Sequence, residues 1–288
     1  MAEISASMVM KLRKMSGQGM MDCKRALQEA GGDVDEAMGI LRKKGLATMA
    51  KRAGRETSEG LVVCKKNADG RTAGLVSLCC ETDFVAKSDA FIATAEKLGE
   101  CSLICEAQEG GENILATKLD GETFAEILNE TVSKTGEKTE VGDFVRYELA
   151  GSGLISTYIH FNNKVGTMVE IEASSDEVAA NASVHQAAND VAMHVTATKP
   201  MGLDKDSISA DVVAGERVIF VEQAKGKPEH IIDKIVEGKM KKFYAENCLV
   251  DQPFVKDDSK TVGEVIAEAG KAAGGEAKIK RFVRLEVG

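Results

Sequence analysis

The sequence of 288 residues predicts an α+β protein, with an N-terminal three-helix module, a core of two related α+β halves, and a protruding helical hairpin. Apolar residues recur at helical spacing through the first part of the chain, strand-like alternation begins at Gly60, and helical spacing returns after Ser209. We expect four units: residues 1–55 as the module with a linker, 56–140 as the first half, 141–201 plus 248–288 as the second half, and 202–247 as the hairpin.

The N-terminal module is predicted from three short amphipathic segments. The glycines at 17 and 19 separate the first segment from a second over residues 21–30, and the apolar stripe of the first consists of Ile4, Met8, Val9, Leu12 and Met15. Asp33 is placed to cap a third helix, which we expect to end at Gly45.

A basic stretch follows the module. Lys51, Arg52, Gly54 and Arg55 resemble a linker to the rest of the chain. Three short helices enclose a very small core, so we expect the unit before this linker to be a docking module.

The first half of the core is predicted from a hairpin signal followed by helices. Apolar runs at 61–64 and 72–78 flank a turn that contains Asp69-Gly70, a dipeptide typical of tight hairpins. A helix over 91–98 and another over about 123–134 follow, and residues 100–121 are expected to connect them.

The second half repeats this pattern. Strands are expected at 144–149, 154–160 and 166–171, followed by a helix over 184–195, and the alternation at 280–287 indicates a returning strand. A shift of 93 residues places Asp83 on Asp176 and Ala86 on Ala179, which indicates that the two halves are related.

The hairpin is predicted from two helical patterns between Ser209 and Asn247. Gly226 and Pro228 separate them, and this order of glycine and proline is typical of a tight connection between two helices. We therefore expect an antiparallel pair that protrudes from the core.

Composition excludes several classes of protein. The net charge of −9 argues against direct nucleic-acid binding, because phosphate recognition needs a basic surface. The start of the chain does not resemble a signal peptide, and no stretch has the length and apolarity of a membrane span, so no membrane partner is expected. The seven cysteines form no regular framework, so we expect reduced thiols and a cytoplasmic location.

The sequence contains no motif that supports covalent chemistry. It has no phosphate-binding loop and no zinc-protease motif, and His185 and His194 project from opposite sides of one predicted helix. We therefore expect no enzyme activity, no metal and no cofactor. A thiol hydrolase using one of the cysteines and one of the four histidines stays open as an alternative, although none of them lies in an activating signature.

Several stretches of the chain, taken together, resemble the bacterial elongation factor Ts family. The main two are LRKMSGQGMMDCKRAL at residues 12–27 and ETDFVAK at 81–87. Looser matches follow in order at Tyr158-Ile159-His160, at Pro253-Phe254-Val255 and in the last strand, so the resemblance covers nearly the whole chain.

The resemblance implies a module with a ubiquitin-associated-like fold and a specific partner, the translation GTPase elongation factor Tu, in its GDP-bound and nucleotide-free forms. It implies guanine-nucleotide exchange, in which the factor docks on the GTPase and disturbs its magnesium and phosphate site. Thr82, Asp83, Phe84 and Val85 would form the intruding tip, Leu12, Met20 and Met21 the contacts of the module, and His160 a contact of the second half.

Structural explanations for the same residues stay open. Asp83 could cap the following helix while Phe84 packs in the core, Leu12 could belong to the helix-bundle core, and His160 could lie at a strand end without a role. The alternative function is a protein-binding adaptor or chaperone that uses the three-helix module without exchanging nucleotide.

Overall fold

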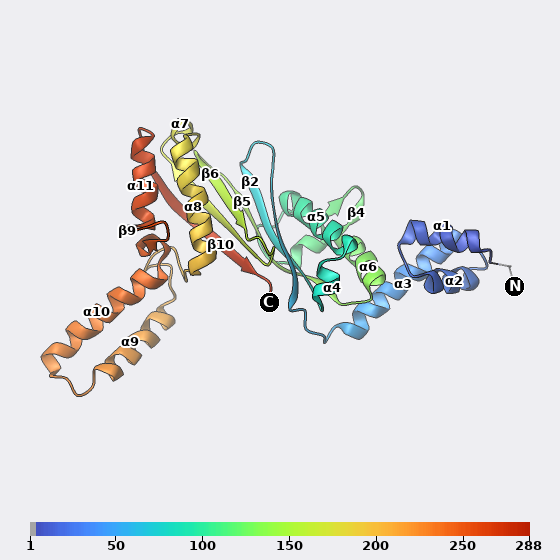
Figure 1. Ribbon diagram of the computed structural model, residues 1–288, viewed down its shortest axis with the longest axis horizontal. Helices are drawn as coiled ribbons and strands as arrows, with labels where there is room; N and C mark the ends of the chain where they lie inside the picture. Colours follow the sequence, from blue (N-terminus) through green and yellow to red (C-terminus); the bar gives the residue numbers. More distant parts are fainter. Residues whose placement is uncertain (1–3) are drawn as a thin grey trace.

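A layered core occupies the middle of the molecule, with the three-helix module at one end and a helical hairpin projecting at the other (Figure 1). This computed structural model describes residues 4–288, apart from the side chains of Met49, Glu229 and His230. The first three residues of the predicted module lie outside the described part. Helices and strands follow one another as expected for an α+β protein.

Three helices form the module: α1 (Ala6–Ser16), α2 (Met20–Glu29) and α3 (Val34–Arg52). The side-chain oxygen of Asp33 accepts hydrogen bonds from the amides of Asp35 and Glu36, so the predicted cap of α3 is confirmed. The small core of the module consists of Val9, Leu12, Cys23, Ala26, Leu27, Ala30, Ala37 and Leu41.

Helix α3 does not end at Gly45, and the prediction of a linker at Lys51 and Arg52 is wrong, because both residues lie in its last turn. Its second part packs against α6 (Phe124–Thr135). A Cβ at Gly45 would lie only 1.9 Å from the Ser133 hydroxyl oxygen, so glycine permits this close approach. A glycine that looked like a helix stop is therefore a packing position inside a longer helix.

The first sheet is antiparallel with strand order β1-β2-β5, formed by β1 (Glu59–Lys66), β2 (Thr72–Cys80) and β5 (Thr139–Glu148). The predicted hairpin between β1 and β2 is confirmed, with Gly70 in the left-handed region at its turn. Strand β5, however, pairs with β2, so the prediction that residues 144–149 belong to the second half is wrong. Pairing depends on long-range contacts, whereas the prediction followed only the proximity of this strand to the next hairpin.

Helices cover the outer face of the first sheet. They are α4 (Asp83–Ala86), α5 (Asp89–Ile104) and α6, which enclose a core that includes Phe91, Leu98, Phe124 and Phe144. The connection predicted at 100–121 is more ordered than expected. It contains the end of α5, a 3-10 turn (Asn113–Ala116) and the first strand of a short hairpin, β3 (Lys118–Leu119) with β4 (Glu122–Thr123).

The second sheet has the order β10-β7-β6, from β6 (Gly153–Ile159), β7 (Val165–Ala173) and β10 (Ala277–Glu286). Strand β10 pairs antiparallel with β7, so the predicted return of the last strand is confirmed. The outer face of this sheet is covered by α7 (Asp176–Ala179), α8 (Ala182–Thr198) and α11 (Val262–Ala272). A 3-10 turn (Leu249–Asp251) and the short strands β8 (Pro253–Phe254) and β9 (Asp257–Thr261) lead into α11.

The relation between the two halves is visible in the helix starts. Helices α4 and α5 begin at Asp83 and Asp89, and α7 and α8 begin at Asp176 and Ala182, each pair separated by the predicted shift. A hydroxyl caps the short helix in both halves, from Thr82 and from Ser175. Each half is therefore an antiparallel sheet combined with the same helix pair.

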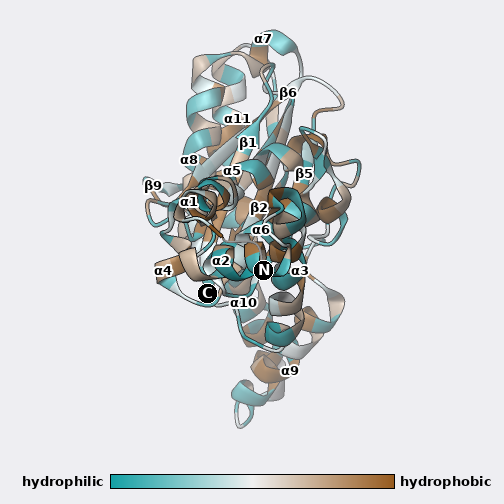
Figure 2. Cartoon of the chain, turned by 90° about the vertical axis from the view of Figure 1, so that its right-hand side faces the viewer, coloured by the Kyte–Doolittle hydropathy of each residue, from teal (hydrophilic) through white to brown (hydrophobic). Residues whose placement is uncertain are grey.

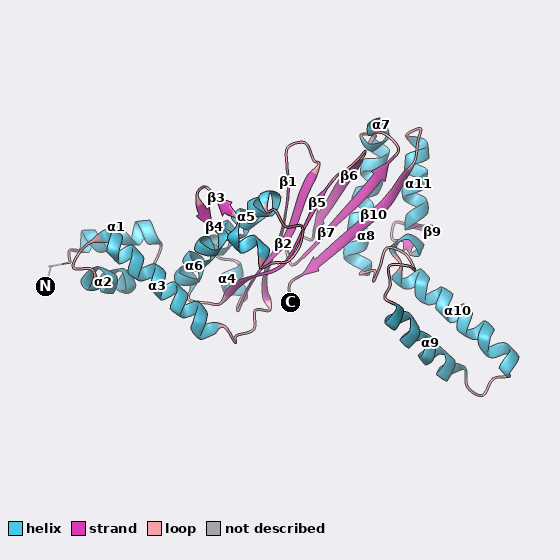
Figure 3. Ribbon diagram, turned by 180° about the vertical axis from the view of Figure 1, so that it is seen from behind, coloured by secondary structure: helices cyan, strands magenta, loops and turns pink. Residues whose placement is uncertain are grey.

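The inner faces of the two sheets pack on one another, which gives four layers in the order helices, sheet, sheet, helices (Figure 3). The buried contacts between the sheets come from Val62, Ala73, Leu75, Tyr147, Leu149, Ile155, Met168, Leu285 and Val287. An ionic cluster also lies at this interface. Glu170 is 2% exposed and accepts hydrogen bonds from Lys280 (2.9 Å) and Arg281 (2.6 Å).

The hairpin consists of α9 (Ala210–Ala224) and α10 (Glu229–Asn247), and the predicted turn at 226–228 is confirmed. Residues of both helices pack together, with Val236, Met240 and Phe243 of α10 against Val213 and Phe220 of α9. Val218 and Val221 of α9, by contrast, are exposed. Figure 2 shows the hydrophobic colouring on α9, which projects away from the core.

Candidate partner-binding site

Metal-binding clusters and reactive thiols are the two kinds of chemical site that the sequence left to be checked in the described residues. Among residues 4–288 no group of three or more His, Cys, Asp or Glu side chains could hold a metal ion. All seven cysteines are free, and burial raises the pKa of Cys64, Cys79, Cys101 and Cys248 to about 11 and that of Cys80 to about 12. These five thiols therefore stay protonated at neutral pH, which disfavours a thiolate nucleophile.

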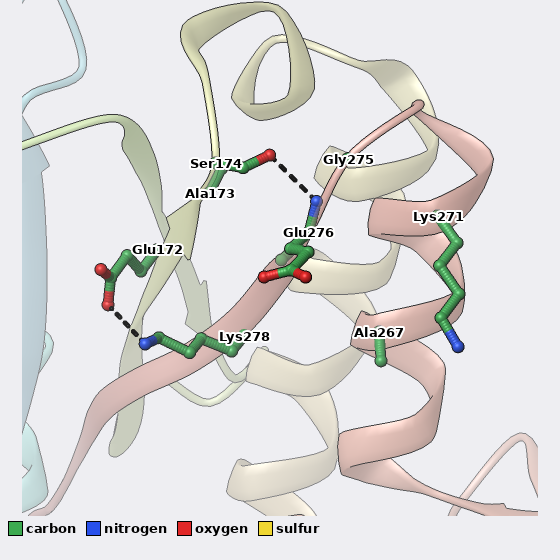
Figure 4. Close-up of a pocket in the computed structure, with 9 residues that line it drawn as sticks. Glu172, Ala173, Ser174, Ala267, Lys271, Gly275, Glu276 and Lys278 are labelled. Atoms are coloured by element: carbon green, nitrogen blue, oxygen red, sulfur yellow. Dashed lines mark hydrogen bonds and ion pairs between the residues drawn. The ribbon is translucent and has the colours of Figure 1, made fainter.

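A hollow of about 330 Å³ lies between the end of β7, the start of β10 and α11 (Figure 4). Several of its polar groups are engaged with one another: Glu172 pairs with Lys278 (3.3 Å), and the Glu276 amide donates to the Ser174 hydroxyl (3.0 Å). Such internally satisfied groups do not favour a small-molecule site. The exposed surfaces are therefore the better candidates for function.

The tip, residues 82–85, is presented outward from the end of the first sheet. The Thr82 hydroxyl accepts from the Val85 amide and so caps α4, while Val85 is half-buried against the core of the first half. Phe84 is 84% exposed, so the alternative that it packs in the core is wrong. Thr82, and not Asp83, is the capping residue of α4.

Two carboxylates hold the base of the tip in place. Glu81 accepts two hydrogen bonds from the Arg52 guanidinium (2.7 and 2.8 Å) and one from the Lys138 amide (2.6 Å). Glu137 accepts from both the amide (3.1 Å) and the hydroxyl (2.8 Å) of Thr82. Desolvation opposes ionisation of Glu81, but the Lys138 amide and the Arg52 guanidinium outweigh it and lower the pKa of that carboxyl. Glu81 and Thr82 are therefore held in place, and the exposed residues of the tip come directly after them in the chain.

Asp83 lies beside Phe84 and remains accessible. Its carboxylate accepts from Lys87 one helical turn later (2.6 Å), and this hydrogen bond holds the pKa of Asp83 below its ordinary value. The side chain keeps about half of its accessible surface. The tip thus combines an ionised carboxylate with an exposed aromatic ring.

The contacts predicted in the module divide into two kinds. Leu12 is 0% exposed and lies in the core of the module, so the prediction that it touches a partner is wrong. Its place on the apolar stripe of α1 explains the burial. Met20 and Met21 are 46% and 63% exposed. Met10, which the sequence analysis did not assign, and Met15, which it placed on the apolar stripe of the first helix, are exposed as well. The density of methionines between residues 8 and 21 was the available signal.

His160 lies at the end of β6 and is half-buried. Its ring centroid is 4.4 Å from that of Phe161, which is 88% exposed and was not assigned a role from the sequence. The loop that carries these two rings lies on the same edge of the core as the tip, because Asn162 and Asn163 of the loop line the same groove as Ala86 and Lys87, which directly follow the tip.

The structure therefore brings the tip and the β6–β7 loop to one groove at the edge of the core. Met20 and Met21 lie on α2, in the separate module whose place Figure 1 shows. Both surfaces expose apolar side chains, as expected of contact sites for a large partner. No helix in the described part of the chain is long and apolar enough to cross a membrane.

A family model and the similar known proteins all point to the same protein family. The family model described as elongation factor TS matches residues 81–288. Elongation factor Ts of Alkalilimnicola ehrlichii is 45% identical to this chain over 287 residues, covering 99% of this chain and 92% of the relative. Elongation factor Ts of Nitratidesulfovibrio vulgaris (42% identical, 99% and 96% covered) and of Clostridioides difficile (39%, 100% and 94%) are similar over comparable lengths. The chain belongs to the elongation factor Ts family of translation factors.

Proposed function

We propose that this chain is a guanine-nucleotide exchange factor for the GTPase elongation factor Tu, and that it acts in the cytoplasm without catalysing a covalent reaction. The observation that carries the proposal is the tip, where an ionised Asp83 and an exposed Phe84 follow a base held by Arg52 and Glu137. Family membership supports the choice of partner. The factor would bind both the GDP-bound and the nucleotide-free partner.

The residues have distinct roles in this proposal. Met20 and Met21 dock the module, because methionine side chains adapt well to an irregular apolar surface. Phe84 enters a pocket beside the nucleotide site, and Asp83 changes the local charge and hydrogen bonding there. Thr82 and Val85 hold these two residues in place, and His160 contacts the third domain of the GTPase.

Magnesium on the partner makes this mechanism effective. The ion demands near-ideal octahedral geometry at short distances, so a small displacement of its ligands or waters weakens nucleotide binding greatly. By linkage, a factor that prefers the nucleotide-free partner must weaken nucleotide binding to the same degree. Each tenfold loosening corresponds to about 1.4 kcal/mol of differential contact. One phenylalanine cannot supply several such steps, so the module and the core must contribute together.

The test is the release of a fluorescent GDP analogue from elongation factor Tu, followed by stopped-flow with and without the purified chain. We expect faster release that saturates with the concentration of the chain. If the chain binds the GTPase but leaves the lifetime of the bound nucleotide unchanged, the exchange function is wrong and the adaptor alternative is supported. If it neither binds nor accelerates release, the proposed partner itself is wrong.

A further inference from the structure

Phe161 has the most exposed of the large hydrophobic side chains in the described part of the chain, at 88% of its surface. It lies in the loop that joins β6 to β7, one residue after His160. An aromatic ring left in water is unfavourable unless something covers it, and exposed aromatic residues are enriched among the strongest contacts of protein interfaces. The value of such a ring as a contact depends on whether the loop holds it in a fixed position.

Hydrogen bonds within the loop make a tight turn. The Asn163 amide donates to the His160 carbonyl (2.8 Å), and the Lys164 amide donates to the Asn162 side chain (3.0 Å). Asn163 occupies the left-handed region at φ 55°, which asparagine tolerates better than most residues. The ring of Phe161 rests against His160, so the turn and its aromatic residue form one unit.

The turn is also fastened to both halves of the core. The Val62 amide of β1 donates to the Asn163 carbonyl (2.7 Å), and Lys164 pairs with Glu59 of the same strand (2.7 Å). The Val287 amide, just after β10, donates to the Lys164 carbonyl (2.8 Å). A loop held in this way loses little conformational freedom when a partner binds, which favours affinity.

A groove of about 540 Å³ joins this loop to the tip. It runs along the edge strand β1, between the helical layer and the β6–β7 hairpin, and its lining is largely apolar, including Val62, Ile92 and Ile159. Ala86 and Lys87, which directly follow the tip, line one part of it, and Asn162, which follows Phe161, lines another. The groove therefore extends from the residues that follow the tip to the loop that carries Phe161.

We infer that Phe161 is a second aromatic anchor for the same GTPase, and that the groove between the β6–β7 loop and the residues that follow the tip takes an apolar surface of that partner. This inference rests on the proposed function. Continuity of the groove with the tip argues for one partner at both places, because Ala86 and Lys87 belong to the lining of the groove and directly follow the tip. The preformed turn argues for an anchor whose conformation does not change on binding.

The contribution of Phe161 is to affinity and not to the rate of nucleotide release. Residues 160–164 include no carboxylate, and the ammonium group of Lys164 is engaged by Glu59, so the loop offers no charged group to compete for a metal ion or a phosphate. An apolar contact of this kind is made equally before and during release. Loss of such uniform binding raises the half-saturating concentration and leaves the maximal rate unchanged.

The experiment compares the wild-type chain with Phe161→Ala, Phe161→Tyr and a control, Ile104→Ala, in the nucleotide-release assay. Ile104 is a 55% exposed apolar residue at the far end of α5 from the groove. We expect Phe161→Ala to raise the half-saturating concentration about tenfold, the equivalent of about 1.4 kcal/mol, with the maximal rate within about twofold. Phe161→Tyr retains the ring and is expected to stay close to wild type, as is Ile104→Ala.

Two outcomes would overturn the inference: an unchanged half-saturating concentration for Phe161→Ala, or an equal rise for Ile104→Ala. Circular dichroism and thermal unfolding confirm that the variants fold. If the wild-type chain binds the nucleotide-free GTPase without accelerating release, the proposed function fails by itself. The dissociation constant of Phe161→Ala for that nucleotide-free partner then decides the inference, and an unchanged value contradicts it.

Discussion

Among single residues, Phe84 carries the most direct prediction. Because its side chain is 84% exposed, Phe84→Ala is expected to leave the free energy of unfolding within about 0.5 kcal/mol of wild type. The loss of the inserted ring should lower the maximal rate of GDP release at least about tenfold, about 1.4 kcal/mol of barrier. Stopped-flow release at saturating factor measures this rate. An unchanged maximal rate would remove the tip from the mechanism.

The buried His194 predicts a pH dependence of stability. Its Nε2 lies 2.8 Å from the Gln252 side-chain oxygen, and its Nδ1 accepts from the Val255 amide (3.3 Å), so the neutral ring satisfies both contacts. Burial lowers the pKa of His194, and the hydrogen bond that its Nε2 donates to the Gln252 side-chain oxygen opposes this shift. The folded state therefore binds fewer protons than the unfolded state, whose histidine titrates near pH 6.5.

The free energy of unfolding should accordingly be highest above about pH 6.5 and should fall as the pH drops below that value towards the lowered pKa of the folded state. Urea unfolding at pH 7.5 and 5.5 measures the difference. His194→Gln is expected to be less stable at both pH values but to show a smaller difference between them. The same difference in both proteins would show that another group is responsible.

Two residues show what could not be predicted from the sequence at single positions. Leu12 was expected at the partner surface, but an apolar residue on a helical stripe has the same pattern whether a neighbouring helix or a partner covers it. Phe161 was overlooked because the alternation of β6 ends before it, and only the turn shows that its ring is outside the core. The exposure of Phe84, by contrast, agrees with the role that the surrounding motif implied.

Among the helices and strands, α3 links the module to the tip, because Arg52 in its last turn holds Glu81. Arg52→Gln should loosen the residue that precedes Thr82 and lower the maximal rate of nucleotide release, while Phe84 is unchanged. The pair is partly exposed, so the expected cost in stability is at most about 1 kcal/mol. Release kinetics and urea unfolding on the same preparation measure both effects.

Lys51→Gln is the matched control, because Lys51 is exposed in the same helical turn as Arg52 and its substitution removes the same positive charge. It should release nucleotide at the wild-type rate. An equal slowing in both variants would indicate a general effect of charge on association, and positioning of the tip by Arg52 would then be wrong.

Most elements were predictable, and the errors have a common cause. Local patterns located the hairpin at 67–70, the turn at 226–228 and the returning strand β10. The predicted end of α3 and the predicted assignment of β5 to the second half were wrong. Each depends on contacts with residues far away in the sequence: α3 packs against α6, and β5 pairs with β2. Local propensity contains no information about such contacts.

For the molecule as a whole, the joint between the two sheets combines an apolar interface with Glu170 and its two cations. Arg281 also lies over the ring of Tyr147, 3.9 Å from its centroid. Glu170→Gln would leave two cations without their anion beside a buried position. We expect a loss of about 1–3 kcal/mol in the free energy of unfolding, measured in urea.

Glu172→Gln on the same strand is the control, because its pair with Lys278 is exposed. Its expected effect is below about 1 kcal/mol. Equal losses in the two variants would mean that burial of Glu170 contributes nothing to the joining of the sheets.

The continuity of α3 has a consequence for the proposed selection of a GTPase partner. A helix of 19 residues spans about 28 Å, and its packing on α6 connects the module that carries Met20 and Met21 to the core without a flexible linker. The two proposed contact sites, the module and the tip, are therefore held at a fixed distance from each other. A GTPase whose two complementary surfaces are spaced differently would bind poorly, even if each surface alone fitted the module or the tip.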